Sequence, residues 1–169
     1  YGRNTMGGII NIYTKSPLQY EGTTLGASLG NYMQQNYNVS HYRKLGEKFG
    51  IAISGNYNQT DGFFTNQHTG EKADDSQSGS ARIRLEWQPK EQLSFGLTST
   101  YARTNQGGYP YAVCDPEILR PGEVNYNDYS FYKRSMSTTG LSVKWDGKGY
   151  SIQNQMAFQT ISDHQGIDQ

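Results

Sequence analysis

Apolar and polar side chains alternate with a period of two along several stretches of the chain. Such alternation predicts half-buried β-strands, because successive side chains of a strand point to opposite faces. Five segments show it clearly, and they begin at Phe49, Ala81, Leu93, Thr139 and Tyr150. Two weaker segments, 23–29 and 37–41, precede them. The pattern predicts about seven strands in an all-β fold.

The connections between these segments differ in length. Short turns are expected at 44–48, 88–92 and 146–149, and long polar connections at 61–77 and 105–134. The connection at 31–34 is short and does not fit the long class. Short turns at one end of a meander and long loops at the other are typical of a transmembrane antiparallel β-barrel. This is the predicted fold class, with the barrel only partly present.

Four aromatic residues lie beside the short turns. They are Phe49, Trp87, Trp145 and Tyr150, and all belong to the apolar strand faces. This is where a membrane barrel carries its interfacial aromatic girdle. The alternative is that they are core aromatics of a soluble β-sandwich. Arg82, Arg84 and Glu86 share one strand face, which suits a wet lumen, but a sandwich also exposes one face of each sheet.

The amino-acid composition excludes further classes of protein. Hydrophobic residues make up only 34% of the chain and the mean hydropathy is -0.81, yet aromatics reach 13%, with 14 Tyr. Disordered chains are poor in aromatics, whereas barrel strands need an apolar residue only at alternate positions. Equal numbers of basic and acidic residues, 15 of each, argue against a nucleic-acid surface. No apolar run is long enough for a transmembrane helix.

No motif for catalysis or for cofactor binding is found in the sequence. There is no nucleophile elbow, zinc-protease helix or phosphate-binding loop, so neither an enzyme nor a cofactor is expected. The single Cys114 allows no internal disulfide and no cysteine-based metal site. His41, His68 and His164 lie on separate segments, and Asp74-Asp75 is a loop pair. We expect these histidine and aspartate side chains to be solvated at the surface, and no metal site is predicted.

The first sixteen residues differ in kind from the rest. Gly7-Gly8 permits a tight turn or close backbone approach, and the β-prone run of residues 9–13 favours a strand. The string resembles the end of the plug domain in TonB-dependent outer-membrane receptors, where Tyr-Gly-x-x-x-x-Gly-Gly-x-Ile-Asn-Ile-x-Thr-Lys precedes the first barrel strand. The residues assigned to the plug end from this string are Tyr1, Gly2, Arg3, Gly7, Gly8, Asn11, Thr14 and Lys15.

The resemblance implies that residues 1–17 are the end of a plug and residues 18–169 the N-terminal part of a barrel, beginning near Gly22. Barrels of this family have about 22 strands, so an internal fragment is expected. The family carries scarce nutrients, such as ferric siderophores, haem, cobalamin or oligosaccharides, across the bacterial outer membrane. A ferric siderophore or similar iron chelate is the leading expectation. The implied partners are the TonB–ExbB–ExbD complex, outer-membrane lipid and the nutrient, with no nucleic acid.

The longer of the two polar connections is rich in aromatic and basic residues. The candidate ligand-binding residues are Arg103, Tyr109, Tyr111, Arg120, Tyr126 and Tyr129. Aromatic rings and cations together suit an aromatic, anionic chelate. The alternative is that these residues only pack the loop.

Two other classes remain open. A plug-less porin or adhesin would leave the opening motif unexplained, and a soluble carbohydrate-binding β-sandwich would fold without detergent. Because open sheet edges are not tolerated in lipid, seven strands alone are not expected to insert and fold stably.

Overall fold

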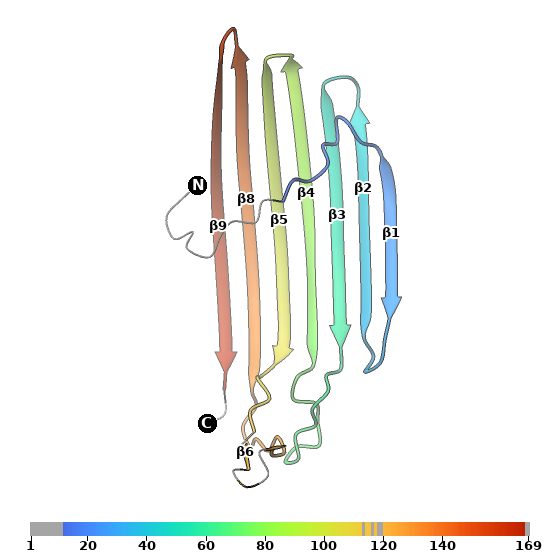
Figure 1. Cartoon of the computed structure of the whole chain (residues 1–169), viewed down its shortest axis with the longest axis vertical. Helices are drawn as coiled ribbons and strands as arrows, with labels where there is room; N and C mark the ends of the chain where they lie inside the picture. The colour runs from blue at the N-terminus through green and yellow to red at the C-terminus, as the bar shows by residue number, and fades with distance from the viewer. Residues whose placement is uncertain (1–11, 113, 116, 118–119, 168–169) are drawn as a thin grey trace.

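The computed structural model of the chain describes residues 12–112, 114–115, 117 and 120–167. Its main element is one antiparallel sheet of seven strands in meander order, β1-β2-β3-β4-β5-β8-β9 (Figure 1). The strands are β1 (Gly22–Leu29), β2 (Gln35–Leu45), β3 (Phe49–Thr60), β4 (Ser76–Lys90), β5 (Leu93–Gly107), β8 (Phe131–Gly147) and β9 (Tyr150–Gly166). The expected all-β meander of about seven strands is confirmed, and β1 begins at Gly22 as predicted.

The strands run further into the polar segments than the alternation indicated. β5 continues to Gly107 and β8 already begins at Phe131, so the long connections are 61–75 and 108–130. Backbone hydrogen bonds extend the ladder whatever the side chains, and Asn105 pairs with Lys133 within it. A two-stranded ribbon of β6 (Cys114–Asp115) and β7 (Arg120–Pro121) inside the second connection was not predicted.

The tight turns and the remaining connections lie at opposite ends of the sheet. Three tight turns, 46–48, 91–92 and 148–149, lie at one end, and the connections 30–34, 61–75 and 108–130 lie at the other (Figure 1). Gly46 and Gly149 take φ of 74° and 84° in the first and third tight turns, a conformation that glycine adopts at little steric cost. The predicted arrangement of short turns opposite long loops is confirmed.

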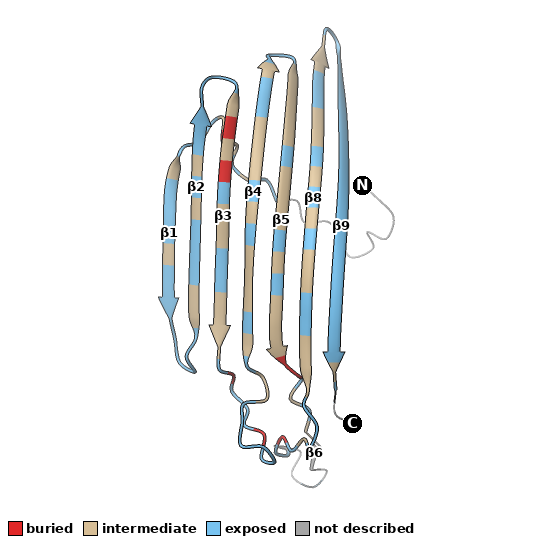
Figure 2. Ribbon diagram, turned by 180° about the vertical axis from the view of Figure 1, so that it is seen from behind, coloured by how far each residue is buried: buried red, intermediate tan, exposed pale blue. Residues whose placement is uncertain are grey.

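The sheet is a single layer. Its strands contact only their hydrogen-bonded neighbours, and Figure 2 shows buried residues at very few places in the ribbon. Among the described residues the only buried hydrophobic side chains in the core are Ala52 and Val124. Ile83 and Leu97 are each 37% exposed, so no second layer from the described residues covers them, which argues against a β-sandwich.

The described part of the chain contains no helix, and so no helix that is long and apolar enough to cross a membrane.

Candidate functional site

The two faces of the sheet have opposite polarity. Directly opposed residues of antiparallel strands share a face, so the register assigns every strand residue to one side. One side, here called the apolar face, has at its middle a transverse row of Leu85, Leu97, Leu141 and Met156. The other side, called the polar face, has a row that crosses all seven strands: Thr24, Ser40, Ser54, Arg82, Thr100, Thr138 and Gln159.

Every carboxylate in the seven strands lies on the polar face. The three are Glu86, Asp146 and Asp163, which the register places opposite Gly50, Ser151 and Arg134. Each forms an ion pair on that face: Glu86 with Arg84, Asp146 with Lys144 at 2.7 Å, and Asp163 with Arg134 at 2.7 Å. The apolar face of these strands therefore carries no negative charge.

The predicted girdle residues lie together at the tight-turn end of the apolar face. Phe49 is directly opposite Trp87, whose ring stacks on Phe95 with centroids 5.3 Å apart. The rings of Trp145 and Tyr150 meet edge to face at 5.9 Å. Trp87 and Trp145 are about half exposed, so these rings form a surface band.

A second aromatic band, which the sequence interpretation missed, lies near the loop end of the same face. It consists of Tyr37, Tyr57 and Tyr101, of which Tyr37 and Tyr57 are direct cross-strand partners. Both of these hydroxyls donate hydrogen bonds toward the loop end, to the amide oxygens of Gln35 at 3.2 Å and Gln59 at 2.9 Å. The alternation already placed Tyr57 and Tyr101 on apolar strand faces, but only the register shows that they form a band.

The segment 12–21 runs across the polar face near the tight-turn end (Figure 1). The Arg84 guanidinium donates to the carbonyl oxygen of Thr14 at 3.4 Å and also to its hydroxyl, and the Ser16 hydroxyl donates to Glu86. Pro17 is fully buried against the backbone of Gly50. Because Gly50 has no Cβ, the backbone of Pro17 and Leu18 can lie close to β3 at this position.

Of the eight plug-end residues named from the sequence, two fall in this segment. Thr14 is held by Arg84 as described above, and the Lys15 ammonium lies 3.9 Å from the centre of the Tyr20 ring. The other motif residues, Tyr1, Gly2, Arg3, Gly7, Gly8 and Asn11, lie outside the described residues.

The two long connections are joined through Asn66. This side chain is 6% exposed. Its amide nitrogen donates to the carbonyl oxygen of Tyr126 at 3.0 Å, and its amide oxygen accepts from the backbone N–H groups of Tyr126 and His68, each at 3.0 Å. Gln67 N–H also donates to the carbonyl of Val124 at 2.8 Å. No sequence signal marked Asn66, because its partner lies 60 residues away.

Three of the predicted ligand-binding tyrosines are brought together at this loop end. The Tyr126 hydroxyl donates a shared hydrogen bond to the carbonyl oxygens of Tyr109 and Tyr111, each at 2.7 Å. The rings of Tyr109 and Tyr111 are 6.0 Å apart and both are at least half exposed. Tyr129 stacks on Phe131 at 5.6 Å and is 72% exposed.

The two predicted arginines do not join this group in the same way. Arg103 lies within β5 on the apolar face, directly opposite Ser135 and not on the loop. Arg120 lies in β7, and its side chain, like that of Cys114 in β6, is outside the described part of the structure.

The loop acids have structural roles. The Asp74 carboxylate accepts hydrogen bonds from the backbone N–H groups of Phe63 and Phe64, each at 2.9 Å. Partial desolvation, followed by the charge of Asp74, raises the pKa of the neighbouring Asp75 above its ordinary value of 3.8. His41, His68 and His164 stay apart, and no cluster of metal ligands occurs among the described residues.

No protein-family model matches the chain.

Proposed function

We propose that this chain belongs to the β-barrel and plug end of a TonB-dependent receptor, which transports a scarce nutrient across the bacterial outer membrane. The observation that carries the proposal is an inversion of the usual polarity. Aliphatic side chains such as Ile53, 51% exposed, cover an open face, while the polar face is the one on which the chain lays its own segment 12–21. In a membrane barrel the apolar face would contact lipid, and the polar face would line a water-containing lumen that is filled by other parts of the chain.

The two aromatic bands support a membrane position for the apolar face. Phe49 and Tyr57 on β3 are eight residues apart, which corresponds to about 27 Å along a strand and about 21 Å across the bilayer at a tilt of roughly 40°. This approaches the roughly 25 Å apolar belt of outer-membrane barrels. The tyrosine hydroxyls that point away from the belt suit rings that lie at a membrane–water boundary.

The open sheet edges of β1 and β9 support a larger barrel. Neither strand has a strand partner on its outer side among the described residues, and unpaired edges are not tolerated in lipid. Further strands must pair with them in the membrane, and a barrel of about 22 strands has a lumen wide enough for a plug. The segment 12–21, which contains the last residues of the plug-end motif, then lies in that lumen.

The loop end is the proposed nutrient-binding surface. The exposed rings of Tyr109, Tyr111 and Tyr129 all project from the connection 108–130, which Asn66 joins to the connection 61–75. Such rings stack on planar aromatic ligands, which favours an iron chelate with aromatic groups as the nutrient. Haem, cobalamin and an oligosaccharide are the alternative ligands, and the uptake assay distinguishes them.

Uptake by cells provides the test of this proposal. Cells that lack the gene are expected to lose high-affinity uptake of one ferric chelate, and restoring the full-length protein should restore uptake only when TonB is present. Uptake of haem, cobalamin or an oligosaccharide instead would keep the transporter class and change the ligand. Passive permeability to small solutes that does not depend on TonB would indicate a porin and reject the proposal.

The aromatic loop residues are tested separately by ligand binding. Tyr111→Ala and Tyr129→Ala in the full-length protein should each weaken chelate binding by about 2–12-fold, since an aromatic contact contributes about 0.5–1.5 kcal/mol. Tyr150→Ala, which removes an exposed ring at the opposite end of the sheet, is the matched control and should leave the affinity unchanged. Equal effects at both ends would reject the loop end as the binding surface.

A further inference from the structure

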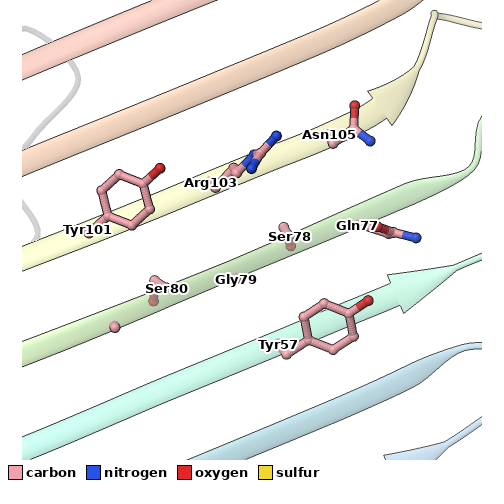
Figure 3. A pocket seen from close by; sticks show the side chains of 9 residues that line it. Tyr57, Gln77, Ser78, Gly79, Ser80, Tyr101, Arg103 and Asn105 are labelled. Atoms are coloured by element: carbon pink, nitrogen blue, oxygen red, sulfur yellow. The ribbon is translucent and has the colours of Figure 1, made fainter.

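The apolar face contains a groove beneath the loop end. It has a volume of about 470 Å³ and lies between the rings of Tyr57 and Tyr101, over the small residues Gly79 and Ala81 (Figure 3). Gly79 is directly opposite Tyr57 on β3, and Ala81 is directly opposite Tyr101 on β5. The absence of side-chain bulk on β4 between two tyrosines therefore creates the hollow.

The groove changes from apolar to polar along its length. Toward the loops it is lined by Gln77, Arg103 and Asn105 (Figure 3). Arg103 is exposed and has no ion-pair partner among the described residues. Lys133, directly opposite Asn105, and His164, directly opposite Lys133, extend the basic character along the same edge of the face.

No carboxylate of the described strands neutralises this positive charge on the apolar face. The three strand carboxylates are all on the polar face, where each already pairs with a basic residue. A guanidinium at the boundary of the hydrocarbon extends into the headgroup layer, where anionic groups are its available partners. Because its donor geometry matches a phosphate group, a phosphate in the surrounding medium would satisfy it.

We propose that the groove is a site for a phosphorylated membrane lipid, with one acyl chain between Tyr57 and Tyr101 and its headgroup phosphate on Arg103. The site rests on the proposed function, because it requires the apolar face to lie in the membrane. Basic pockets beside apolar surface are the arrangement that binds anionic lipid headgroups. The groove volume also falls within the roughly 300–1,000 Å³ of ligand sites.

The charge requirement is tested with two lipids that have the same tails. The full-length protein is purified in detergent and equilibrated with dioleoyl phosphatidic acid or with dioleoylglycerol, and retained lipid is counted by native mass spectrometry. Wild type should retain the phosphorylated lipid at least tenfold better. Arg103→Gln should abolish this preference, whereas Arg82→Gln, the same change on the polar face of β4, should preserve it. Equal preference in both variants would overturn the site.

The shape requirement is tested by filling the groove. Ala81→Leu should reduce retention of the phosphorylated lipid several-fold, and Ala27→Leu, the same change on the apolar face outside the groove, should not. If the protein folds in detergent and supports chelate uptake but retains both lipids equally, the lipid site alone is rejected. If it is instead folded and monomeric in detergent-free buffer, the proposed function is rejected as well.

Discussion

At the scale of single residues, one buried asparagine organises the loop end. Asn66 uses both its amide nitrogen and its amide oxygen to hold Tyr126 across 60 residues of sequence. A buried amide is tolerated only because its hydrogen bonds are made. The position of the exposed tyrosines in the connection 108–130 therefore depends on a buried residue of the connection 61–75.

Replacing this side chain should loosen the two connections. Asn66→Ala leaves the N–H groups of His68 and Tyr126 and the carbonyl oxygen of Tyr126 without their partner, at a local cost of about 1–3 kcal/mol. Hydrogen exchange at the amides of Gln67 and Tyr126 should accelerate by roughly 5- to 150-fold, which is the same energy expressed as a ratio. Asn36→Ala, which removes an exposed hydrogen bond to Ser28 on the strands, should leave both rates unchanged.

The acid pair at the first long connection predicts a pH dependence. The raised pKa of Asp75 means that the native loop holds its proton more tightly than the unfolded loop does. Loop stability should therefore fall as pH rises from about 3.8 through the raised value and then stay low. Asp75→Asn should remove this dependence.

The measurement for Asp75 is the exchange rate of the Gly107 amide, which donates to the Asp75 carbonyl at 2.8 Å, after correction for the intrinsic rate at each pH. At pH 7 the variant should be better protected than wild type, and below pH 4 the two should converge. Glu71→Gln, which also removes one exposed loop charge, serves as the control. Identical pH profiles for wild type and Asp75→Asn would contradict the prediction.

At the scale of elements, the segment 12–21 packs on β3 and β4, across the polar face of the sheet. This association combines a buried proline, a glycine beneath it, and polar contacts from Arg84 and Glu86. These groups come from the half of β3 and β4 nearest the tight turns.

A single methyl group should disturb this association. In Gly50→Ala the new Cβ would lie 2.7 Å from the Pro17 carbonyl carbon, so backbone must move, at about 1–3 kcal/mol for such overpacking. The Tyr20 amide, which donates to the Ser16 carbonyl at 2.9 Å, should exchange faster. Gly140→Ala on the same face has room for its Cβ, 3.6 Å from its nearest neighbour, and should not have this effect.

At the scale of the whole molecule, the opposed faces determine how the sheet can be placed. The apolar face lacks any strand carboxylate, is bounded by two aromatic bands, and is covered by no other part of the described chain. A soluble protein would bury such a face against a second layer. If lipid surrounds the sheet, the same apolar side chains are removed from water without a second protein layer.

Adjacent arginine substitutions on β9 test this placement in the full-length protein. Met156 and Gln155 are both exposed but lie on the apolar and polar faces, respectively. Met156→Arg should destabilise folding into lipid vesicles by about 2–4 kcal/mol, the midplane cost of a charge on a barrel exterior. Gln155→Arg should cost little, because residue 155 lies on the polar face. Similar losses for both variants would contradict a membrane-facing apolar surface.

The amino-acid sequence was sufficient to predict the strands, their meander order and the band of Phe49, Trp87, Trp145 and Tyr150. Alternation has a period of two residues and depends only on the local sequence. Each segment therefore shows by itself which of its side chains share a face. The strand ends were less well predicted at the loop end, because polar ladder residues such as Asn105 and Lys133 resemble loop residues.

Tertiary structure alone decided which distant groups meet. The pairing of Asn66 with Tyr126, the position of Pro17 over Gly50, and the place of Arg103 beside a groove over Gly79 all depend on strand register and loop packing. Register relates residues that are far apart in the chain, and one residue of slip would move every side chain to the other face. Local sequence therefore determined which side chains share a face, whereas only the assembled sheet determined their neighbours across it.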